Sequence, residues 1–404
     1  MKKRLLVVYH FFHPDDVVSA RLFTEFAEEL ATRGWDVSVL TSNRYCRDRK
    51  KSIGLRDETW RGIGIHRSYR PAFDQASNLG RMANALWLMT SWRHFILRQP
   101  PFDAIVLGTD PQFGYGMVPV VKLFRRKTKI ASWGFDIYPE AIEANRMGPV
   151  SKAARLFRPV ARFCYRRLDG MVDIGPCMRS LLDRYNHKAK PATLTPWALE
   201  EPEAPLEPDP QTRERLFGKA RIAVLYSGSI GRAHVFERLI ALARELRRRN
   251  ASIAFCFAGR GNRFEALKNR FTSEDANVSF AGFADEQELA KRLGAGDIHM
   301  ISLREGWEGV VVPSKFFGAI AAGKPVLYEG PATSSIKRWI DQYGLGWTVD
   351  ENNLTTVADM LCHLAERPER LKEKQEQAHR CYRRYFSKKE TMDNWDRFLK
   401  ELCA

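Results

Sequence analysis

The chain has 404 residues, 44% of them apolar and 28% charged, which is the composition of a globular protein and excludes a disordered one. A formal net charge of +17 predicts an anionic partner, but no nucleic-acid motif accompanies the basic residues. An anionic lipid surface or a phosphorylated substrate is therefore the better expectation, and a basic protein with no specific partner is the plainer alternative. At this length we expect two domains, each with its own core.

The cysteines and the N-terminus bear on where the protein works. Seven cysteines are scattered along the chain and form no C-x-x-C pair, a pattern typical of reduced thiols in a cytoplasmic protein rather than of disulfides or a zinc site. The first residues, MKKRLLVVYHFFHPDD, imitate a signal peptide, but His10 and His13 interrupt the short apolar run. We therefore interpret the run as the first strand, and no apolar stretch reaches the roughly 18 residues of a membrane span.

Apolar periodicity in the first half of the chain predicts alternating strands and helices. The predicted strands are 4–9, 36–41, 103–107 and 170–174, and the predicted helices are 19–33, 80–98, 151–168 and 176–185. Between them, residues 44–75 are polar and irregular, which predicts a mobile loop on the side of the domain that would receive an acceptor. The first half thus predicts a domain built from β-α-β units.

Two of these helices have alternative interpretations. Segment 80–98 carries Trp87 and Trp92 among basic residues, so it is either packed in the core or an interfacial helix with aromatic anchors. Segment 151–168 sets four arginines on one face, opposite an apolar one; they are Arg155, Arg158, Arg162 and Arg166. A solvated helix face explains this pattern as well as a membrane surface does.

The composition changes at 195–214, where TPWALEEPEAPLEPDPQTRE contains five prolines and a cluster of acids. This is typical of a semi-rigid linker, and we expect the hinge near 198–208. Strand–helix units then follow, with predicted strands at 221–226, 252–258, 277–280, 297–301 and 325–328 and predicted helices at 233–249, 262–271, 285–293, 314–322 and 333–342. The residues after Asp350 are helical by pattern, and a final helix is predicted near 390–402.

The stretch 300–328 has the features of an anion site. A β-branched run ends at Pro313, Ser314 is a predicted N-cap, and Lys315 opens an apolar helix that ends at Gly323. Free N–H groups at the helix start, the helix dipole and the lysine charge would meet at one point. An ordinary α/β crossover with an incidental surface lysine is an equally open alternative.

The same stretch also carries a family resemblance. The pattern P-S-K-x-x-G-x-x-A-A-G-K-P-V-L, together with Y-S-G-S-I-G-R-A-H at 226–234 and W-G-F-D-I-Y-P-E at 133–140, resembles the retaining GT-B glycosyltransferases of family 4. The similarity is closest to the branch that builds O-antigen, capsule and exopolysaccharide repeat units, which includes fucosamine-transferase-like enzymes. The blocks come in the family's order, and the similarity covers essentially the whole chain.

The resemblance implies an α/β fold of GT-B architecture, with two Rossmann-like domains facing each other across a cleft. Residues 1–200, with a crossing-back helix at 388–404, are then the acceptor-binding domain, and residues 201–387 bind the nucleotide-sugar donor. It also implies a metal-independent, hexosyltransferase-type enzyme without a cofactor. Such an enzyme moves a sugar from a nucleotide diphosphate-sugar, UDP favoured over GDP, to a polyprenyl-diphosphate-linked sugar acceptor in surface polysaccharide biosynthesis.

The implied partners are the donor, the lipid-linked acceptor and an anionic membrane surface, without nucleic acid. The implied location is cytoplasmic, on the inner face of the cell membrane. Two alternatives stay open. One is a GT-B nucleotide-sugar 2-epimerase, against which the basic helices of the first half argue, and the other is a non-catalytic module that binds a nucleotide sugar or a membrane.

A departing diphosphate must be stabilised by cations and helix N-termini if no metal does so. The resemblance assigns this to Arg232 and Lys315, which are counted with the catalytic residues; surface cations at two tight turns are the alternative. His234 either bonds a phosphate oxygen or packs in the core. The other donor-side candidates are Gly228, Gly231, Gly259, Gly282, Phe283, Pro313 and Ser314.

The sequence departs from the family at two places. The family often has an E-x7-E pair, of which the second glutamate, on the ribose, falls on Gly318 here. By the same spacing the first, on the sugar, falls on Val310. Aligning the E-G-x-x-x-P pattern instead makes it Glu308, with a two-residue insertion before the helix and Glu305 as its rival. The ribose must therefore be held otherwise, and the first loop, HFFHPDDVVS, lacks the family's glycines.

In the first half, Asp136 follows the apolar stretch KIASW. The resemblance makes it the carboxylate that orients the acceptor hydroxyl and stabilises positive charge on the sugar. A carboxylate that caps the following helix is the alternative. The acceptor-side candidates are His13, Asp15, Tyr138 and Glu140.

Overall fold

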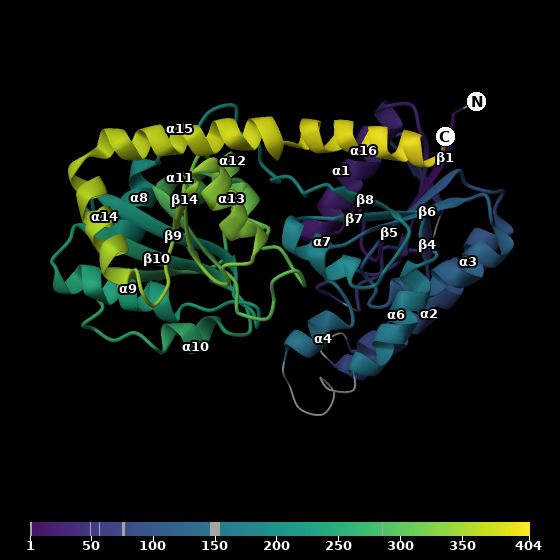
Figure 1. The fold of residues 1–404 in the computed structure, drawn as a ribbon, viewed down its shortest axis with the longest axis horizontal. Helices are drawn as coiled ribbons and strands as arrows, with labels where there is room; N and C mark the ends of the chain where they lie inside the picture. The colour runs from purple at the N-terminus through teal and green to yellow at the C-terminus, as the bar shows by residue number, and fades with distance from the viewer. Residues whose placement is uncertain (1, 49, 56, 75–76, 146–153, 285) are drawn as a thin grey trace. The chain divides into compact units, whose positions relative to one another are not determined.

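The computed structural model describes residues 2–404 except 49, 56, 75–76, 146–153 and 285. Its internal contacts divide the chain into two units. The first unit comprises Met1–Leu199, Gly309–Val311 and Thr391–Ala404, and the second comprises Glu200–Glu308 and Val312–Glu390. Each unit is a parallel sheet covered by helices (Figure 1). No helix among the described residues is long and apolar enough to cross a membrane.

The sheet of the first unit has the order β3-β4-β2-β1-β5-β6-β7-β8 within the described residues. Its strands are β1 Arg4–Val8, β2 Asp36–Ser42, β3 Glu58–Trp60, β4 Ile63–Ser68, β5 Ala104–Gly108, β6 Lys129–Trp133, β7 Gly170–Asp173 and β8 Lys190–Thr193. All pairs are parallel except β3–β4. The chain order reverses between β1 and β5, and such a switch point is where parallel α/β sheets bind ligands.

The helices of the first unit return the chain between these strands. They are α1 Val18–Thr32, α2 Asn78–Arg98, the short helix η1 Gly114–Met117, α3 Val118–Phe124, α4 Glu140–Ala144, η2 Arg155–Phe157, α6 Arg158–Tyr165 and α7 Pro176–Asp183. The start of the predicted helix 151–168 lies outside the described residues. In α2, Trp92 is buried and Trp87 is exposed, so the core explanation holds for one tryptophan only.

The second unit contains the described strand order β11-β10-β9-β12-β13-β14, all parallel. The strands are β9 Ile222–Ser229, β10 Ile253–Arg260, β11 Val278–Ala281, β12 Ile298–Ser302, β13 Val326–Glu329 and β14 Gly346–Thr348. The strands β9, β10, β12 and β13 are apolar on both faces because helices cover both sides of the sheet. Here the switch point lies between β9 and β12.

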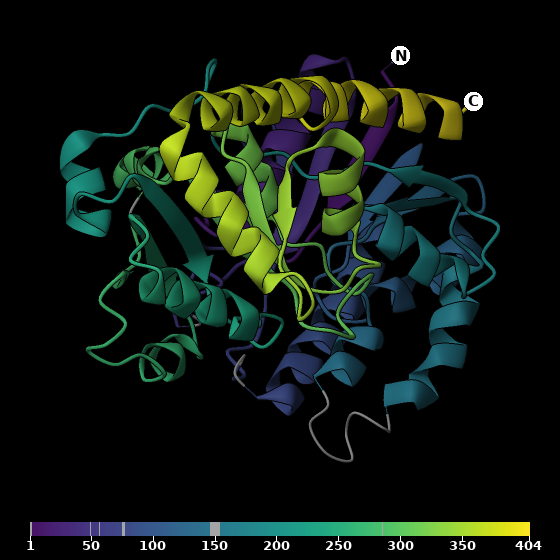
Figure 2. The same ribbon diagram turned by 60° about the vertical axis from the view of Figure 1, so that its left-hand side comes forward.

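The helices of the second unit complete a doubly wound domain. They are α8 Pro210–Phe217, α9 Glu237–Arg248, α10 Phe264–Lys268, α11 Glu286–Ala295, α12 Lys315–Ala321, α13 Ser335–Tyr343, α14 Leu354–Glu366 and α15 Pro368–Tyr385. Residue 285, with which the predicted helix 285–293 begins, is not described. In Figure 2, where this unit comes forward, α14 runs obliquely in front of the sheet, and it buries Val357 and Leu361 in the same core as β9 and β10.

The last helix is α16 Lys388–Leu402. From Thr391 onward it belongs to the first unit, the domain to which the final helix was predicted to return. Trp395 is buried with its ring centroid 4.9 Å from that of Phe26 and 5.0 Å from that of Trp133. The indole N–H of Trp35 donates to Asp396 (2.9 Å). The apolar face of α16 thus completes the core of the first unit.

The proline-rich linker is fastened to the second unit. Pro202 O lies 2.9 Å from His379 Nε2, Leu206 N–H donates to Ala322 O (3.0 Å), and Lys324 Nζ donates to Leu206 O (2.7 Å). These bonds leave little of the predicted hinge segment 198–208 free after Leu199. Lys324, the lysine of the G-K-P pattern, therefore anchors the linker to the second unit.

The interpretation of residues 44–75 as irregular is wrong for the part from Glu58 to Ser68. Strands β3 and β4 form a hairpin there, and β4 continues the sheet beside β2. Ile63, Ile65 and Arg67 face inward in alternation, and the buried Arg67 guanidinium is neutralised by Glu58 (2.5 Å). The inward arginine hid the alternation that predicts a strand. Three further strands, β6, β8 and β14, were also not predicted.

Candidate functional site

The phosphate-loop candidate of the second unit begins at the end of β9 and is tightly packed. Gly228 has a φ of +137°, and a Cβ placed on it would lie 2.5 Å from Lys315 Cε. Gly259 has a φ of +154°, and a Cβ there would lie 1.9 Å from Gly228 O. Both positions need glycine for conformation and for space. The structure therefore brings the predicted loop, the β10 turn and Lys315 together.

His234 and Lys315 form the chemical centre of this loop. The Gly231 N–H donates to His234 Nδ1 (3.1 Å), so the neutral imidazole carries its proton on Nε2. Lys315 Nζ lies 3.3 Å from that Nε2, so two hydrogen-bond donors meet. Within the described chain, no carboxylate pairs with Lys315. An anionic oxygen is the acceptor that both groups lack.

Burial sets the charges of this pair. Burial and the neighbouring Lys315 charge lower the pKa of His234 to about 3, so the imidazole stays neutral at physiological pH. Burial also lowers the pKa of Lys315 to about 8, so the ammonium form dominates at pH 7. The centre thus presents one positive charge and one neutral N–H donor.

The helix starts beside the loop contribute less than expected. Ser314 stands at the predicted N-cap position of α12, but its backbone is already helical and its side chain makes no capping hydrogen bond. The Phe316 and Phe317 N–H groups donate to the Pro313 and Ser314 carbonyls, so they are not free for an anion. The binding capacity at α12 therefore rests on the Lys315 side chain.

The first amides of α9 are also occupied. The buried Glu329, at the end of β13, accepts the N–H groups of Arg238 and Leu239 (3.1 Å each). Arg232 lies exposed in the loop that precedes α9, and its guanidinium has no partner among the described residues. Arg232 and Lys315 are thus two side-chain cations of this loop system, and Arg304, whose guanidinium donates to His234 O (3.4 Å), is a third.

The other donor-side candidates lie on neighbouring turns. Glu308 accepts the Gly306 N–H (2.8 Å). The Gly282 carbonyl accepts from Arg292 (2.6 Å), and the guanidinium of Arg260 lies 3.8 Å from the centroid of the half-exposed Phe283 ring. Gly282 and Phe283 border a groove of about 440 Å³, which offers a flat aromatic face to a ligand.

The first unit has its own polar cluster at the switch point between β1 and β5. His10 Nδ1 lies 3.0 Å from Asp110 Oδ1, and His10 Nε2 lies 3.3 Å from Arg70 Nη1. Because arginine only donates, Nε2 accepts and Nδ1–H donates to Asp110. His10 and Arg70 are almost fully buried, whereas the Asp110 side chain is 41% exposed. The chain Arg70–His10–Asp110 therefore fixes one exposed carboxylate.

Asp136 lies in the loop after β6, near this cluster. The N–H groups of Phe135 and Asp136 both donate to Thr109 Oγ1 (3.2 Å each), which holds the loop against the end of β5. Desolvation and the negative charge of Asp110 raise the pKa of the Asp136 carboxyl to about 6. Tyr138 accepts from Gln112 (3.2 Å). A carboxylate with a raised pKa is typical of a functional position.

The remaining acceptor-side candidates have structural partners. His13 stacks on Trp60 of β3, with ring centroids 4.3 Å apart. The buried Asp15 accepts the N–H groups of Val17 (3.3 Å) and Cys46 (2.6 Å), so it fixes the first loop. Glu140 is buried and accepts from Tyr185 OH (2.5 Å). Their acceptor-side roles stay predictions.

Sequence reasoning missed His10, Asp110 and Arg70. A signal was present for the first two, because each follows a predicted strand, and adjacent parallel strands end at one edge. Arg70 gave no signal, because a basic residue in a polar stretch predicts solvent exposure.

We expect Gly228→Ala to displace Lys315. The new Cβ would overlap the lysine Cε, and the positive φ adds strain of about 1–3 kcal/mol. Anion affinity at this loop should fall more than tenfold, measured by calorimetric titration with a nucleoside diphosphate. A variant that keeps wild-type affinity would show that the lysine has no role in binding there.

Gly318→Ala is the matched control and should stabilise the protein. A Cβ at Gly318, within α12, would meet nothing within 4 Å, and replacing a helical glycine gains about 0.5–1 kcal/mol. A higher midpoint of thermal unfolding with unchanged anion affinity is the expected result. A lower midpoint would mean that this face of α12 is closed to side chains.

Two family descriptions match successive parts of the chain. "Glycosyl transferase 4-like domain" matches residues 19–197, and "Glycosyl transferases group 1" matches residues 209–381. Among curated proteins, the chain is similar to the probable glycosyltransferase WbjE of Pseudomonas aeruginosa, with 26% identity over 268 residues. That match covers 65% of this chain and 66%, just under two thirds, of the relative.

Solved structures resemble the whole chain. Sucrose-phosphate synthase from Thermosynechococcus elongatus has a TM-score of 0.74 at 13% identity, with 99% of each chain covered. Anabaena HepE in complex with UDP-glucose has a TM-score of 0.67 at 12% identity, covering 98% of this chain and 99% of that one. These likenesses confirm the predicted fold class.

Proposed function

Because the chain belongs to the glycosyltransferases of GT-B architecture, we propose that it transfers a sugar, with retention of configuration, from a nucleotide diphosphate-sugar to a lipid-diphosphate-linked acceptor. The meeting of two donors, Lys315 Nζ and His234 Nε2–H, carries the donor half of this proposal. UDP is the favoured nucleotide. A HepE structure described as bound to UDP-glucose is among those similar to this chain.

On the donor side, the second unit stabilises the charge of the departing diphosphate. Lys315 supplies a desolvated positive charge, and His234 supplies a neutral N–H with a fixed direction. Arg232 adds a second cation from the glycine loop. Such donors stabilise a leaving group most when they are held in place before the reaction, which the packing of Gly228 and Gly259 provides.

On the acceptor side, the Asp136 carboxylate orients the acceptor hydroxyl and faces the positive charge that develops on the sugar. The bond from the sugar carbon to the diphosphate oxygen breaks as the bond to the acceptor oxygen forms. The hydroxyl proton passes to the departing diphosphate oxygen. Asp110, held by His10 and Arg70, keeps a second negative charge beside Asp136 and contributes to its raised pKa.

Of the family's two glutamate positions, we assign one to a glutamate of this chain, and the other holds a glycine. We assign the sugar contact to Glu308, whose carboxylate lies in the loop before α12 and accepts the Gly306 N–H. No glutamate stands at Gly318, so the ribose is held by other groups. The lipid acceptor places the working enzyme at the cytoplasmic face of a membrane.

The test uses slow hydrolysis of the donor, for which no acceptor need be known. UDP- and GDP-sugars are incubated with the protein in EDTA, and proton NMR records the first anomer released. An initial α-anomer from an α-linked donor is the expected result. Release of the β-anomer would contradict retention, and a protein that binds the donor but never cleaves it would be a binding module.

A further inference from the structure

A groove of about 900 Å³ lies between α6 and α7 on the first unit. Among the described residues that line it, one carboxylate, that of Glu140, stands against six basic side chains. The basic residues are Arg158, Arg162, Arg166, Arg167, Arg184 and Lys188. This groove belongs to neither the glycine loop nor the cluster around Asp110, and the reaction described above does not use it.

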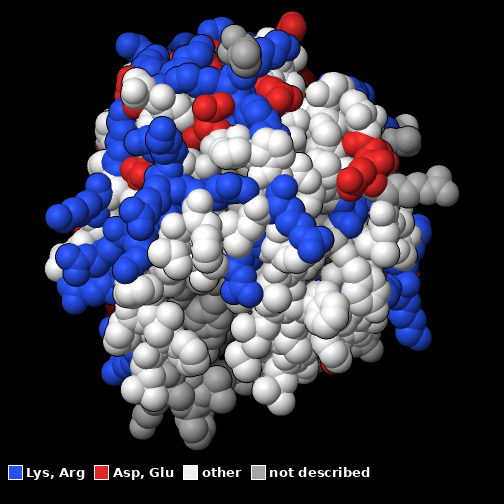
Figure 3. Space-filling view, turned by 90° about the vertical axis from the view of Figure 1, so that its right-hand side faces the viewer, with Lys and Arg blue, Asp and Glu red and all other residues white. Residues whose placement is uncertain are grey.

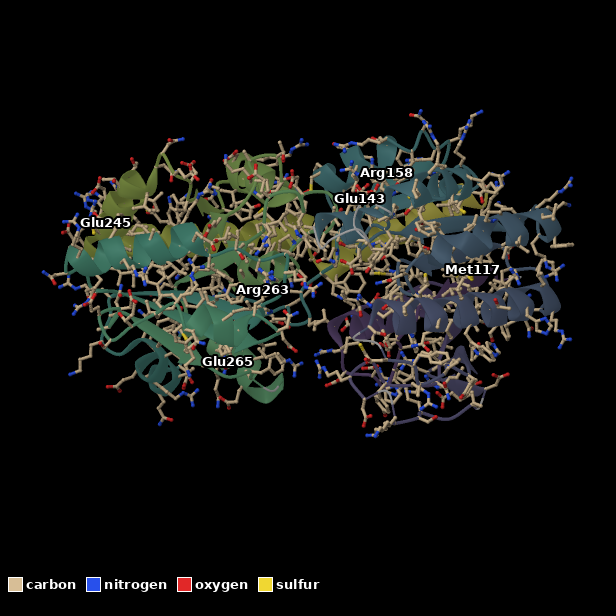
Figure 4. The ribbon with its side chains drawn as sticks, turned by 90° about the horizontal axis from the view of Figure 1, so that it is seen from below. Met117, Glu143, Arg158, Glu245, Arg263 and Glu265 are labelled. Carbon is tan, nitrogen blue, oxygen red and sulfur yellow. The ribbon has the colours of Figure 1, made fainter. Side chains whose placement is uncertain are left out.

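Three of these six side chains form hydrogen bonds within the protein. Arg158 forms a two-pronged pair with Glu143 (2.9 Å for each bond), and both residues are labelled in Figure 4. Arg162 donates to Tyr185 O (3.3 Å). Arg167 donates to Phe163 O (2.8 Å) and covers the Phe163 ring, its Cζ 3.5 Å from the centroid. These contacts shape the walls of the groove.

The other three cations have no such contacts within the part of the chain that the structure describes. Arg166, Arg184 and Lys188 are exposed, and no ion pair or side-chain hydrogen bond joins them to another described residue. Basic groups gathered in a concave site concentrate positive potential there. The groove is therefore suited to an anion that makes several charge-assisted hydrogen bonds, as a phosphate group does.

An exposed apolar ridge borders the groove. Four large apolar side chains on η2 and α6 face solvent, Leu156 with 78% of its surface exposed. They are Leu156, Phe157, Val160 and Phe163. Nearby α2 exposes Leu79, Leu86 and Trp87 as well. Figure 3 views the first unit from the side of α2 and α3, where basic side chains gather beside uncharged surface and acidic ones are few.

We propose that the groove between α6 and α7 binds the phosphate of an anionic phospholipid headgroup while the ridge of η2 and α6 inserts among the acyl chains. A soluble phosphate would use the cations but not the ridge. A helix that lies in a membrane interface combines a basic face with large apolar side chains, as α6 does. The proposal deepens the membrane partner of the proposed function, and its test needs neither donor nor acceptor.

The test is sedimentation of the full-length protein with vesicles of phosphatidylcholine, with and without phosphatidylglycerol. Wild type should bind the anionic vesicles and bind the neutral ones far more weakly. Arg166→Gln with Arg184→Gln should weaken binding about 30-fold, because each basic residue at an anionic leaflet is worth about fivefold. The matched control is Arg370→Gln with Lys372→Gln on α15, which removes the same charge and should change binding less than twofold.

A second variant tests the ridge. Leu156→Ser with Val160→Ser should also weaken binding to anionic vesicles at least fivefold, although it removes no charge. If this variant binds like wild type, the occupant is not a membrane lipid. If the α15 control loses as much as the groove variant, attraction is unspecific and the groove has no special role. Thermal stabilisation by UDP, measured on every variant, should stay at the wild-type value, so a failed donor site is recognised separately.

Discussion

A Lys315→Ala variant is expected to transfer sugar about 10²–10³ times more slowly than the wild-type enzyme, the loss typical of one prearranged donor to a developing anion. Lys315 supplies the positive charge of the donor pair, and His234, whose pKa is lowered by burial, cannot replace it at neutral pH. The measurement is the rate of nucleoside diphosphate release with the preferred donor. Lys372→Ala, an exposed lysine on α15, is the matched control and should be unchanged.

The same lysine predicts a pH dependence. Its pKa is lowered to about 8, so the free site is cationic below pH 8 and neutral above it. Affinity for a nucleoside diphosphate should therefore fall as the pH rises through about 8, and bound diphosphate, by favouring the charged form, shifts the midpoint upward. This dependence should vanish in Lys315→Ala. A variant with the wild-type rate and the same alkaline decline would exclude Lys315 from the donor site.

An Asp136→Asn variant is expected to lose about 10²–10³-fold in kcat, because the neutral amide cannot stabilise the positive charge that develops on the sugar. The pKa of this carboxyl is raised to about 6, so in the wild type the active carboxylate form is lost as the pH falls below 6. The acid limb of the kcat/KM profile should lie near pH 6 and disappear in the variant.

The matched control for this variant is Asp341→Asn. Asp341 pairs with Lys337 on the exposed side of α13, where an ion pair contributes little, so its kinetics should equal the wild type's. If Asp136→Asn keeps the acid limb, another group titrates there, and Asp110 is the next carboxylate to replace. If it keeps the full rate, the acceptor is oriented elsewhere.

The sequence predicted those elements whose apolar pattern is long and uninterrupted. Strands β1, β5 and β9 and helix α9 follow from such runs, and the doubly wound order then places Arg232 and Lys315 on adjacent loops. The short edge strand β3 and its neighbour β4 were missed, and in β4 the inward-facing Arg67 breaks the apolar alternation. A hydrophobicity pattern cannot identify a charged residue that is buried and paired.

The sequence alone did not predict the side-chain contacts on which the chemistry of the site depends. Lys315 and His234 are 81 residues apart, and His10 and Asp110 are 100 apart, so only the folded chain joins them. The tautomer of His234 depends on the direction of one backbone N–H, that of Gly231. Ser314 shows the opposite error, because the residue type suits a cap while its helical backbone prevents one.

The sharpest test of the donor site is thermal unfolding with UDP, GDP or ADP at equal concentrations, with EDTA and with Mg²⁺. A ligand at about 100 times its dissociation constant adds about 2.7 kcal/mol to the stability of the protein, which raises the midpoint by several degrees. We predict that one nucleotide stabilises the wild type and Lys372→Ala in EDTA, and that Lys315→Ala and Arg232→Ala abolish the shift. If no nucleotide stabilises the protein, or if both variants keep the full shift, the donor site is not at this loop.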